Sequence, residues 1–180
     1  MLHQDDAVGP YVVARLIAQY DVPPEVEVVD LGTPGLDMVP YVSDVAHLIV
    51  IDTVHATGEP GELRLYDRDG ILAVAPQPRL GPHDPSLKSA LLTAEFAGNA
   101  PADVLLVGVI PGGVKNAVGL TPGVQRAVSA ALAQVVVALA KGGHAPVPKA
   151  APTQPDLWWE RAAANHRDAE AQRTHREINS

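Results

Sequence analysis

The sequence predicts an α/β fold, namely a three-layer α/β/α sandwich whose twisted sheet is mostly parallel. Segments with strand patterns alternate with segments of helical spacing, which is typical of this class. Two continuous aliphatic runs, at His47–Val54 and Asp103–Ile110, suit strands that helices cover on both faces. Apolar residues make up 47% of the chain and aromatic residues only 4%, so we expect an aliphatic core.

The first third of the chain is expected to contain two helices and two strands. The first helix has Val8, Val12 and Leu16 on one stripe, and a pair of prolines ends it. The β-branched run HLIVIDTV is expected to be a central strand. In order, the expected elements are a helix over Ala7–Tyr20, a strand over Val26–Leu31, a short helix over Leu36–Val42 and a strand over His47–Val54.

The rest of the domain repeats the alternation. Ser86 can cap a helix, and the run DVLLVGVI predicts a second buried strand. The last helix keeps helical spacing from Val124 to Leu139 before two glycines end it. In order, we expect a strand over Glu62–Tyr66, a proline-rich loop over Pro76–Pro85, a helix over Ser86–Phe96, a strand over Asp103–Ile110 and a helix from Pro122 to Lys141.

The chain is expected to hold one domain and a tail. Residues 1–143 are assigned to the domain, residues 144–156 to a Pro/Ala-rich linker, and residues 157–180 to a flexible or loosely helical tail. Doubly wound sheets usually begin with a strand that sits centrally. Because a helix comes first here, the first central strand is expected to be missing from this chain.

Charge and composition exclude several classes of partner. The formal net charge is -8 and the basic residues do not cluster, which disfavours nucleic acid and anionic membranes as partners. The chain has no cysteine, so disulfides, zinc thiolate sites and a cysteine nucleophile are excluded. No basic apolar signal sequence is visible, and no apolar run is expected to span a bilayer. The expected location is the cytoplasm.

The residues that could do chemistry are those near the carboxyl ends of the expected strands, where α/β folds bind ligands. They are Asp5, Asp6, Asp30, Asp52 and His83, with His55 as a rival to His83. Asp5 and Asp6 precede the first helix, where acidic side chains commonly act as caps. Asp52 is less easily explained as structural, because a carboxylate in a buried strand needs a partner or solvent.

Two carboxylates and an imidazole admit two kinds of chemistry. They could form an oxygen-rich site with open positions for nickel, zinc, manganese or iron. The two carboxylates could instead act as an acid/base pair without metal. The residues do not decide between these alternatives. A nucleotide site and an α/β-hydrolase are poorly supported, because the chain has neither a P-loop nor a G-x-S-x-G motif.

Six short motifs follow one another along the chain. They are D-D-A-V-G-P at Asp5–Pro10, V-D-L-G-T-P-G at Val29–Gly35, I-D-T-V at Ile51–Val54, P-H at Pro82–His83, L-V-G-V-I-P at Leu106–Pro111 and G-L-T-P at Gly119–Pro122. In this order and spacing they resemble the hydrogenase maturation endopeptidases, and the resemblance runs from Asp5 to about Lys141.

The resemblance implies an endopeptidase that removes a C-terminal extension from the large-subunit precursor of nickel–iron hydrogenase after nickel insertion. It assigns metal contact to Asp6, Asp52 and His83, and catalysis to Asp6 and Asp52. The nickel would be recognised in the precursor rather than permanently bound. Cleavage could use the metal or a carboxylate base, although the family is often classed with aspartic-type peptidases. Asp30 and the turn residues Gly32, Thr33 and Gly35 correspond to a segment expected to shape substrate docking.

Two other functions stay open, and one feature departs from the family pattern. A non-catalytic nickel-sensing or chaperone-like module of the same fold is the main alternative, and a small-molecule hydrolase is the third. Family members begin with a hydrophobic strand ending in G-x-G-N, which is absent here. We therefore expect the chain as it stands to be poorly stable and at risk of being inactive, and cooperative melting of a soluble product would contradict this.

Overall fold

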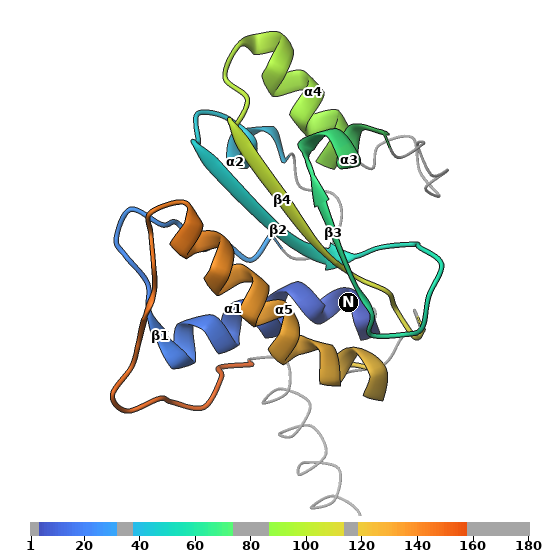
Figure 1. The fold of residues 1–180 in the computed structure, drawn as a ribbon, viewed down its shortest axis with the longest axis vertical. Helices are drawn as coiled ribbons and strands as arrows, with labels where there is room; N and C mark the ends of the chain where they lie inside the picture. Colours follow the sequence, from blue (N-terminus) through green and yellow to red (C-terminus); the bar gives the residue numbers. More distant parts are fainter. Residues whose placement is uncertain (1–3, 32–37, 74–86, 114–118, 158–180) are drawn as a thin grey trace, which may run out of the picture.

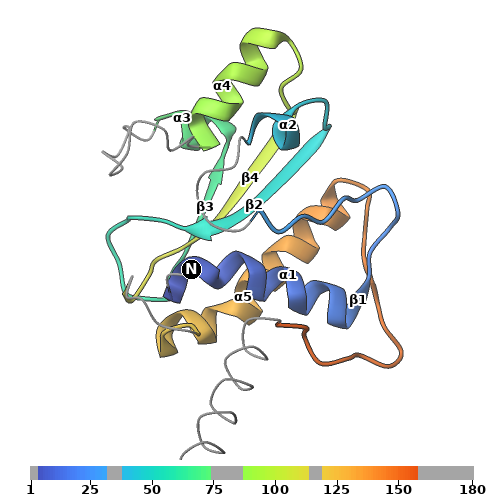
Figure 2. The same cartoon turned by 180° about the vertical axis from the view of Figure 1, so that it is seen from behind.

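A three-stranded sheet lies between two groups of helices (Figure 1). The computed structural model describes residues 4–31, 38–73, 87–113 and 119–157. One face carries α1 (Val8–Gln19) and α5 (Pro122–Lys141), and the other carries α2 (Val39–Val42), α3 (Arg68–Ala73) and α4 (Leu87–Ala97). Figure 2 shows the same two groups from behind. The predicted three-layer α/β/α class is confirmed.

The sheet has the strand order β2-β4-β3, formed by β2 (His47–Thr53), β4 (Asp103–Val109) and β3 (Leu63–Asp67). β2 and β4 are parallel and in register from His47↔Asp103 to Thr53↔Val109, so they end at the same edge. The expectation that the His47–Val54 strand is central is wrong, because β4 holds that position and β2 lies at the edge. The apolar residues of β2 are accordingly only partly buried, whereas Val107 and Val109 of β4 are fully buried.

The direction of β3 corrects a second expectation. β3 pairs antiparallel with β4, from Leu63↔Val109 to Asp67↔Leu105, so the sheet is mixed rather than mostly parallel. Residues 54–62, which connect β2 to β3, contain no helix. Parallel neighbours need a long crossover connection, whereas a short connection turns the chain back. The short link therefore explains why β3 runs against the other two strands.

Alternate residues of β4 face two separate apolar layers. Leu105, Val107 and Val109 belong to the cluster formed with α1 and α5. Val104 and Leu106 belong to the cluster formed with α2, α3 and α4. This alternation follows from strand geometry, in which successive side chains point to opposite faces. The core is aliphatic on both sides, as predicted.

Helix α5 is apolar enough to raise the question of a membrane span. By length and composition alone, this helix of 20 residues is long and apolar enough to cross a membrane. Of its 18-residue apolar window, 39% is buried inside the structure. The expectation that no run reaches this length is therefore wrong. In this structure the stripe from Val124 to Leu139 packs against the sheet and α1, and core helices commonly meet the same test. Its composition is explained by that packing.

The segment Val26–Leu31, predicted to be a strand, has no regular secondary structure. Its alternating apolar and charged residues suit a half-buried strand, and Val26 does pack against the core. A strand also needs a neighbouring backbone to pair with, and none of the described strands pairs with this segment. The local pattern indicates that one face of the segment is buried, but it does not show whether another strand lies beside it.

Residues 144–157, expected to be a linker and the start of a tail, follow the end of α1. Their strand β5 (Val147–Pro148) pairs antiparallel with β1 (Tyr20–Asp21). Lys149 supplies its backbone N–H to Gln19 O at 2.9 Å and its Nζ to Ile17 O at 2.7 Å. Helix ends leave carbonyl groups without intrahelical partners, and this segment satisfies them for α1. Hydrogen bonding therefore orders a stretch that is poor in apolar residues.

Candidate active site

Asp6 and Asp52 both accept a hydrogen bond from Thr53, the last residue of β2. Asp6 belongs to the 3-10 helix η1 (Gln4–Ala7), and Asp52 is the next-to-last residue of β2. The Thr53 hydroxyl donates a hydrogen bond to Asp6 Oδ1 at 3.2 Å, and the Thr53 N–H donates to Asp52 Oδ1 at 2.7 Å. All three residues are partly exposed. Thr53 thus connects both carboxylates at a solvent-accessible edge, where α/β folds bind ligands.

Close packing of α1 on β2 sets the place of Asp6. A Cβ atom at Gly9 would lie 2.7 Å from the carbonyl oxygen of Ile51, closer than side chains tolerate. Glycine therefore permits the start of α1 to approach the backbone next to Asp52. The short distance between the helix and the strand places η1, and with it Asp6, over the end of β2.

Asp5 is fully buried, and its partners differ from the partner of Asp6. Its Oδ2 accepts hydrogen bonds from the N–H groups of Gly112 at 2.8 Å and Gly113 at 3.1 Å, and from the Thr121 hydroxyl at 2.9 Å. Its Oδ1 accepts one from the Thr121 N–H at 2.7 Å. The alternative role of cap for the first helix is not observed, because the N-cap of α1 is Ala7 and has no side-chain cap bond.

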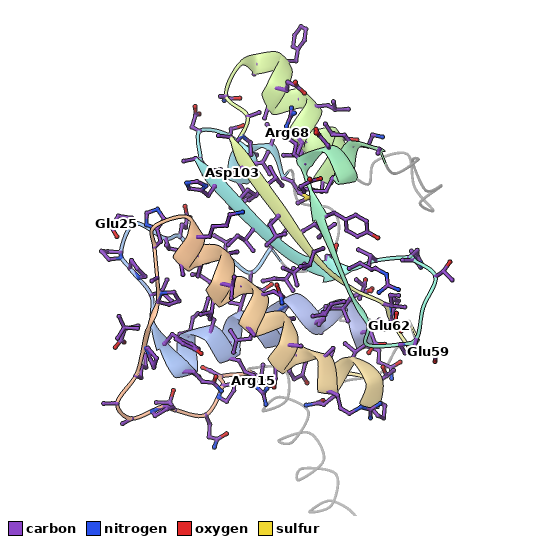
Figure 3. All side chains as sticks on the ribbon, viewed as in Figure 1. Arg15, Glu25, Glu59, Glu62, Arg68 and Asp103 are labelled. Carbon is purple, nitrogen blue, oxygen red and sulfur yellow. The ribbon has the colours of Figure 1, made fainter. Side chains whose placement is uncertain are left out.

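The loop between β2 and β3 is braced beside the same edge. Arg64 donates to Glu62 Oε2 at 2.7 Å and to the Thr57 carbonyl oxygen at 2.8 Å. The Arg64 hydrogen bond, followed by one from the backbone of Glu59, lowers the pKa of Glu62 below its ordinary value. In Figure 3, Glu59 and Glu62 lie together on this loop. The contacts hold the loop that leaves the site after Thr53.

Of the remaining residues that the resemblance assigns to the site, only Asp30 lies within the described ranges. Asp30 is an exposed residue of the irregular segment after residue 25. Gly32, Thr33, Gly35 and His83 lie outside the described residues. Within the described ranges, no group of three or more His, Asp or Glu side chains could hold a metal ion.

Sequence reasoning missed the two threonines that organise this region. Thr53 directly follows Asp52, and a hydroxyl next to a strand-end carboxylate was the available signal. Thr121 lies 116 residues from the carboxylate it contacts, so no local pattern reveals it. Its position before Pro122 suits a helix cap. It is the N-cap of α5, but its hydroxyl is used by Asp5 instead of the helix.

The chain forms a three-layer α/β domain with two partly exposed carboxylates, Asp6 and Asp52, hydrogen-bonded to Thr53 at the carboxyl end of β2. Residues 10–138 match the family model of the hydrogenase maturation proteases. The chain belongs to this family. The activity inferred from the six motifs, a peptidase that processes the C-terminus of a hydrogenase large subunit, is therefore confirmed at the level of the family.

Individual relatives agree with that assignment. The hydrogenase 2 maturation protease of Escherichia coli K12 is 32% identical over 152 residues, covering 84% of this chain and 92% of that protein. The structure of the hydrogenase maturating endopeptidase HybD from E. coli superposes with a TM-score of 0.75, covering 82% of this chain and 91% of that one at 32% identity. A hydrogenase 2 maturation peptidase from a Thaumarchaeota archaeon gives 0.55, with 77% and 91% coverage at 31% identity.

Proposed function

We propose that this protein cleaves the C-terminal extension from a nickel–iron hydrogenase large-subunit precursor once that precursor holds nickel. The observation that carries the proposal is the pair of Thr53 hydrogen bonds, which join Asp6 and Asp52 at one accessible edge. Family membership supports the peptidase reaction and the large-subunit partner. The nickel requirement, the roles of individual residues and the cytoplasmic location belong to the proposal.

Asp6 and Asp52 are proposed to contact nickel that the precursor brings. Carboxylate oxygens are acceptable ligands for divalent nickel, and an imidazole such as that of His83 would complete a mixed oxygen and nitrogen set. Enzyme and precursor then share one metal. A precursor without nickel lacks that shared contact and binds more weakly, so cleavage responds to nickel insertion through differential affinity.

One of the two carboxylates is proposed to act as general base, as in an aspartic-type peptidase. It would accept a proton from the attacking water while the water oxygen bonds to the scissile carbonyl carbon. When the carbon–nitrogen bond breaks, the base returns that proton to the leaving nitrogen, giving a carboxylic acid and an amine, and the acid then ionises in solvent. The precursor's nickel would add electrostatic stabilisation of the carbonyl oxygen. Asp52 suits the base because β2 holds its backbone in the sheet.

Docking of the precursor is proposed to use Asp30 together with Gly32, Thr33 and Gly35. In the sequence, these residues lie between Val26, which packs against the core, and the start of α2. The cytoplasm is the proposed location, because the longest apolar helix serves the domain core. Neither nucleic acid nor a membrane has a place in the proposed reaction, which agrees with the net charge of -8.

Incubation of nickel-loaded precursor with wild-type protein and with Asp6→Ala tests the proposal. Wild type should shorten the precursor, and Asp6→Ala should fail to do so. Binding is followed in the same samples by analytical gel filtration. If both proteins bind the precursor and neither shortens it, the chain is a non-catalytic nickel-sensing or chaperone-like module and the proposed reaction is wrong. Glu25→Ala, which removes an exposed carboxylate in the turn after β1, is the control and should leave cleavage unchanged.

A further inference from the structure

A buried carboxylate next to Asp6 takes part in none of the chemistry proposed above. Asp5 has no exposed surface, and it is the one buried charged residue among those the structure describes. Isolating a charge in this way is costly unless hydrogen bonds compensate it. Asp5 accepts four, of which three come from backbone N–H groups and one from the Thr121 hydroxyl. Such complete pairing indicates a defined task.

The donors come from two segments that are remote in sequence. Gly112 and Gly113 follow β4, at separations of 107 and 108 residues from Asp5. Thr121 is the N-cap of α5, at a separation of 116 residues. Asp5 therefore connects η1 to the exit of the central strand and to the start of the longest helix. We call this set of four hydrogen bonds the Asp5 latch.

The latch also limits where Asp6 can lie. Asp5 and Asp6 are joined by one peptide plane, which rotates only about its flanking bonds. Fixing the Asp5 side chain from four directions therefore restrains the Asp6 backbone. Asp6 in turn accepts the Thr53 hydrogen bond at 3.2 Å, a long contact that a small displacement would break. The two neighbouring aspartates thus have different partners and different tasks.

We propose that Asp5 is a positioning residue that holds Asp6 against Thr53 through the latch, and that it is not itself a metal contact. This inference rests on the proposed function, because it concerns where a carboxylate of that reaction lies. Its burial keeps Asp5 away from a docking precursor. Both carboxylate oxygens are also occupied by protein donors.

The latch requires a carboxylate in particular. All four partners are donors, so an acceptor on both oxygens is needed. Asp5→Asn keeps the shape but replaces one acceptor by an NH₂ donor that faces other donors. Thr121→Val removes only the hydroxyl partner and keeps the volume. The two variants therefore disturb the same latch to different degrees, and Thr121→Ser restores the hydroxyl.

Steady-state cleavage of nickel-loaded precursor tests the role. Asp5→Asn should lower kcat about 10- to 100-fold, since small misplacements of a reacting group have effects of this order. KM should rise by a smaller factor, because a displaced Asp6 also contacts the precursor's nickel less well. Thr121→Val should lower kcat about two- to fivefold by the same argument, and Thr121→Ser should recover it. Unchanged kcat in folded Asp5→Asn, or a rise in KM alone, overturns the proposal. If Asp5→Asn does not fold, unchanged kcat in Thr121→Val overturns it.

NMR on the free protein separates this inference from the proposed reaction. Amide exchange at Gly112, Gly113 and Thr121 should be slow in wild type and faster by at least about tenfold in Thr121→Val or Asp5→Asn, because local opening becomes easier. The Thr53 and Asp6 resonances should shift in the same variants. If wild type does not cleave the precursor but these changes occur, the reaction is wrong and the latch stands. If exchange and the Thr53 resonance stay as in wild type, the latch proposal is wrong.

Discussion

The two ends of the β2–β4 pair carry polar residues of similar type in very different settings. At the amino end, His47 Nδ1 lies 3.0 Å from Asp103 Oδ2, and their side chains are 41% and 78% exposed. At the carboxyl end, Asp5 is fully buried and Asp6 and Asp52 meet at Thr53. Figure 3 shows Asp103 at the end of the sheet opposite the loop that holds Glu59 and Glu62.

The difference lies in how many parts of the chain hold each group. The His47–Asp103 pair joins residues at the starts of two adjacent strands, and exposed pairs of this kind contribute little to stability. The carboxyl end draws together η1, β2, the exit of β4 and the start of α5. The same strands therefore carry a solvated surface at one end and an organised site at the other.

The largest expected effect comes from replacing a carboxylate by an amide at one end of the β2–β4 pair or at the other. Asp52→Asn should lower kcat/KM for the nickel-loaded precursor by about 100-fold or more, because general-base groups contribute on this scale. Asp103→Asn should change it less than about twofold, since an exposed pair is only weakly coupled to its surroundings. Equal losses in the two variants would remove the functional distinction between the ends. Circular dichroism should show that both variants are folded.

The close approach of α1 to β2 gives the next largest effect. Gly9→Ala places a methyl group 2.7 Å from the Ile51 carbonyl oxygen, so the helix must move. Overpacking of this kind lowers the free energy of unfolding by about 1 to 3 kcal/mol, and cleavage should fall with it because η1 moves too. Gly142→Ala is the matched control, because its nearest atoms lie at 3.6 Å or beyond. Urea unfolding compares the two, and equal stabilities would contradict this account of the packing.

A smaller effect is expected at the far end of α1. Lys149→Met removes the Nζ hydrogen bond to Ile17 O but keeps most of the apolar stem. The free energy of unfolding should fall by about 0.5 to 1.5 kcal/mol, the usual contribution of one hydrogen bond. Cleavage should stay at the wild-type rate. Lys141→Met at the exposed end of α5 is the control. An equal fall in its free energy of unfolding would show that the hydrogen bond from Lys149 to Ile17 does not cause the loss.

The smallest effect concerns the loop beyond Thr53. Arg64 lowers the pKa of Glu62 from its ordinary value of 4.5, so the pair stabilises the fold above about pH 4.5 and loses that contribution as the pH falls through the lowered pKa. Arg64→Met should raise the Glu62 pKa towards its ordinary value in an NMR titration, with the Glu59 backbone hydrogen bond still lowering it. Added salt should reduce the shift in wild type, because both side chains are exposed to solvent. An unchanged titration in the variant would show that Arg64 is not the cause.

Much of the fold could be predicted from local patterns, because burial and periodicity are local properties. The strands at His47–Thr53 and Asp103–Val109 and helices α1 and α5 all appear close to the predicted bounds. Pairing is a non-local property, and it caused the errors. Val26–Leu31 has a strand pattern without a partner, and the direction of β3 depends on the length of a loop.

The candidate site also has features that are local in sequence and features that are not. The positions of Asp6 at a helix start and of Asp52 at a strand end could be predicted, and in the structure both carboxylates accept a hydrogen bond from Thr53. Their roles stay a prediction. The different task of Asp5 could not be predicted, because its four donors lie more than a hundred residues away. Two adjacent aspartates look equivalent in sequence. Only the packing distinguishes the buried carboxylate of Asp5 from the partly exposed carboxylate of Asp6.

Intact-mass analysis of a large-subunit precursor, prepared with and without nickel and incubated with this protein, tests the central claim most directly. The account predicts that the nickel-loaded precursor loses a single C-terminal peptide in the presence of wild-type protein and keeps its full mass with Asp52→Asn. The nickel-free precursor should keep its full mass with both. Cleavage that proceeds equally without nickel, or that survives Asp52→Asn, would contradict the account of a nickel-gated site at the carboxyl end of β2.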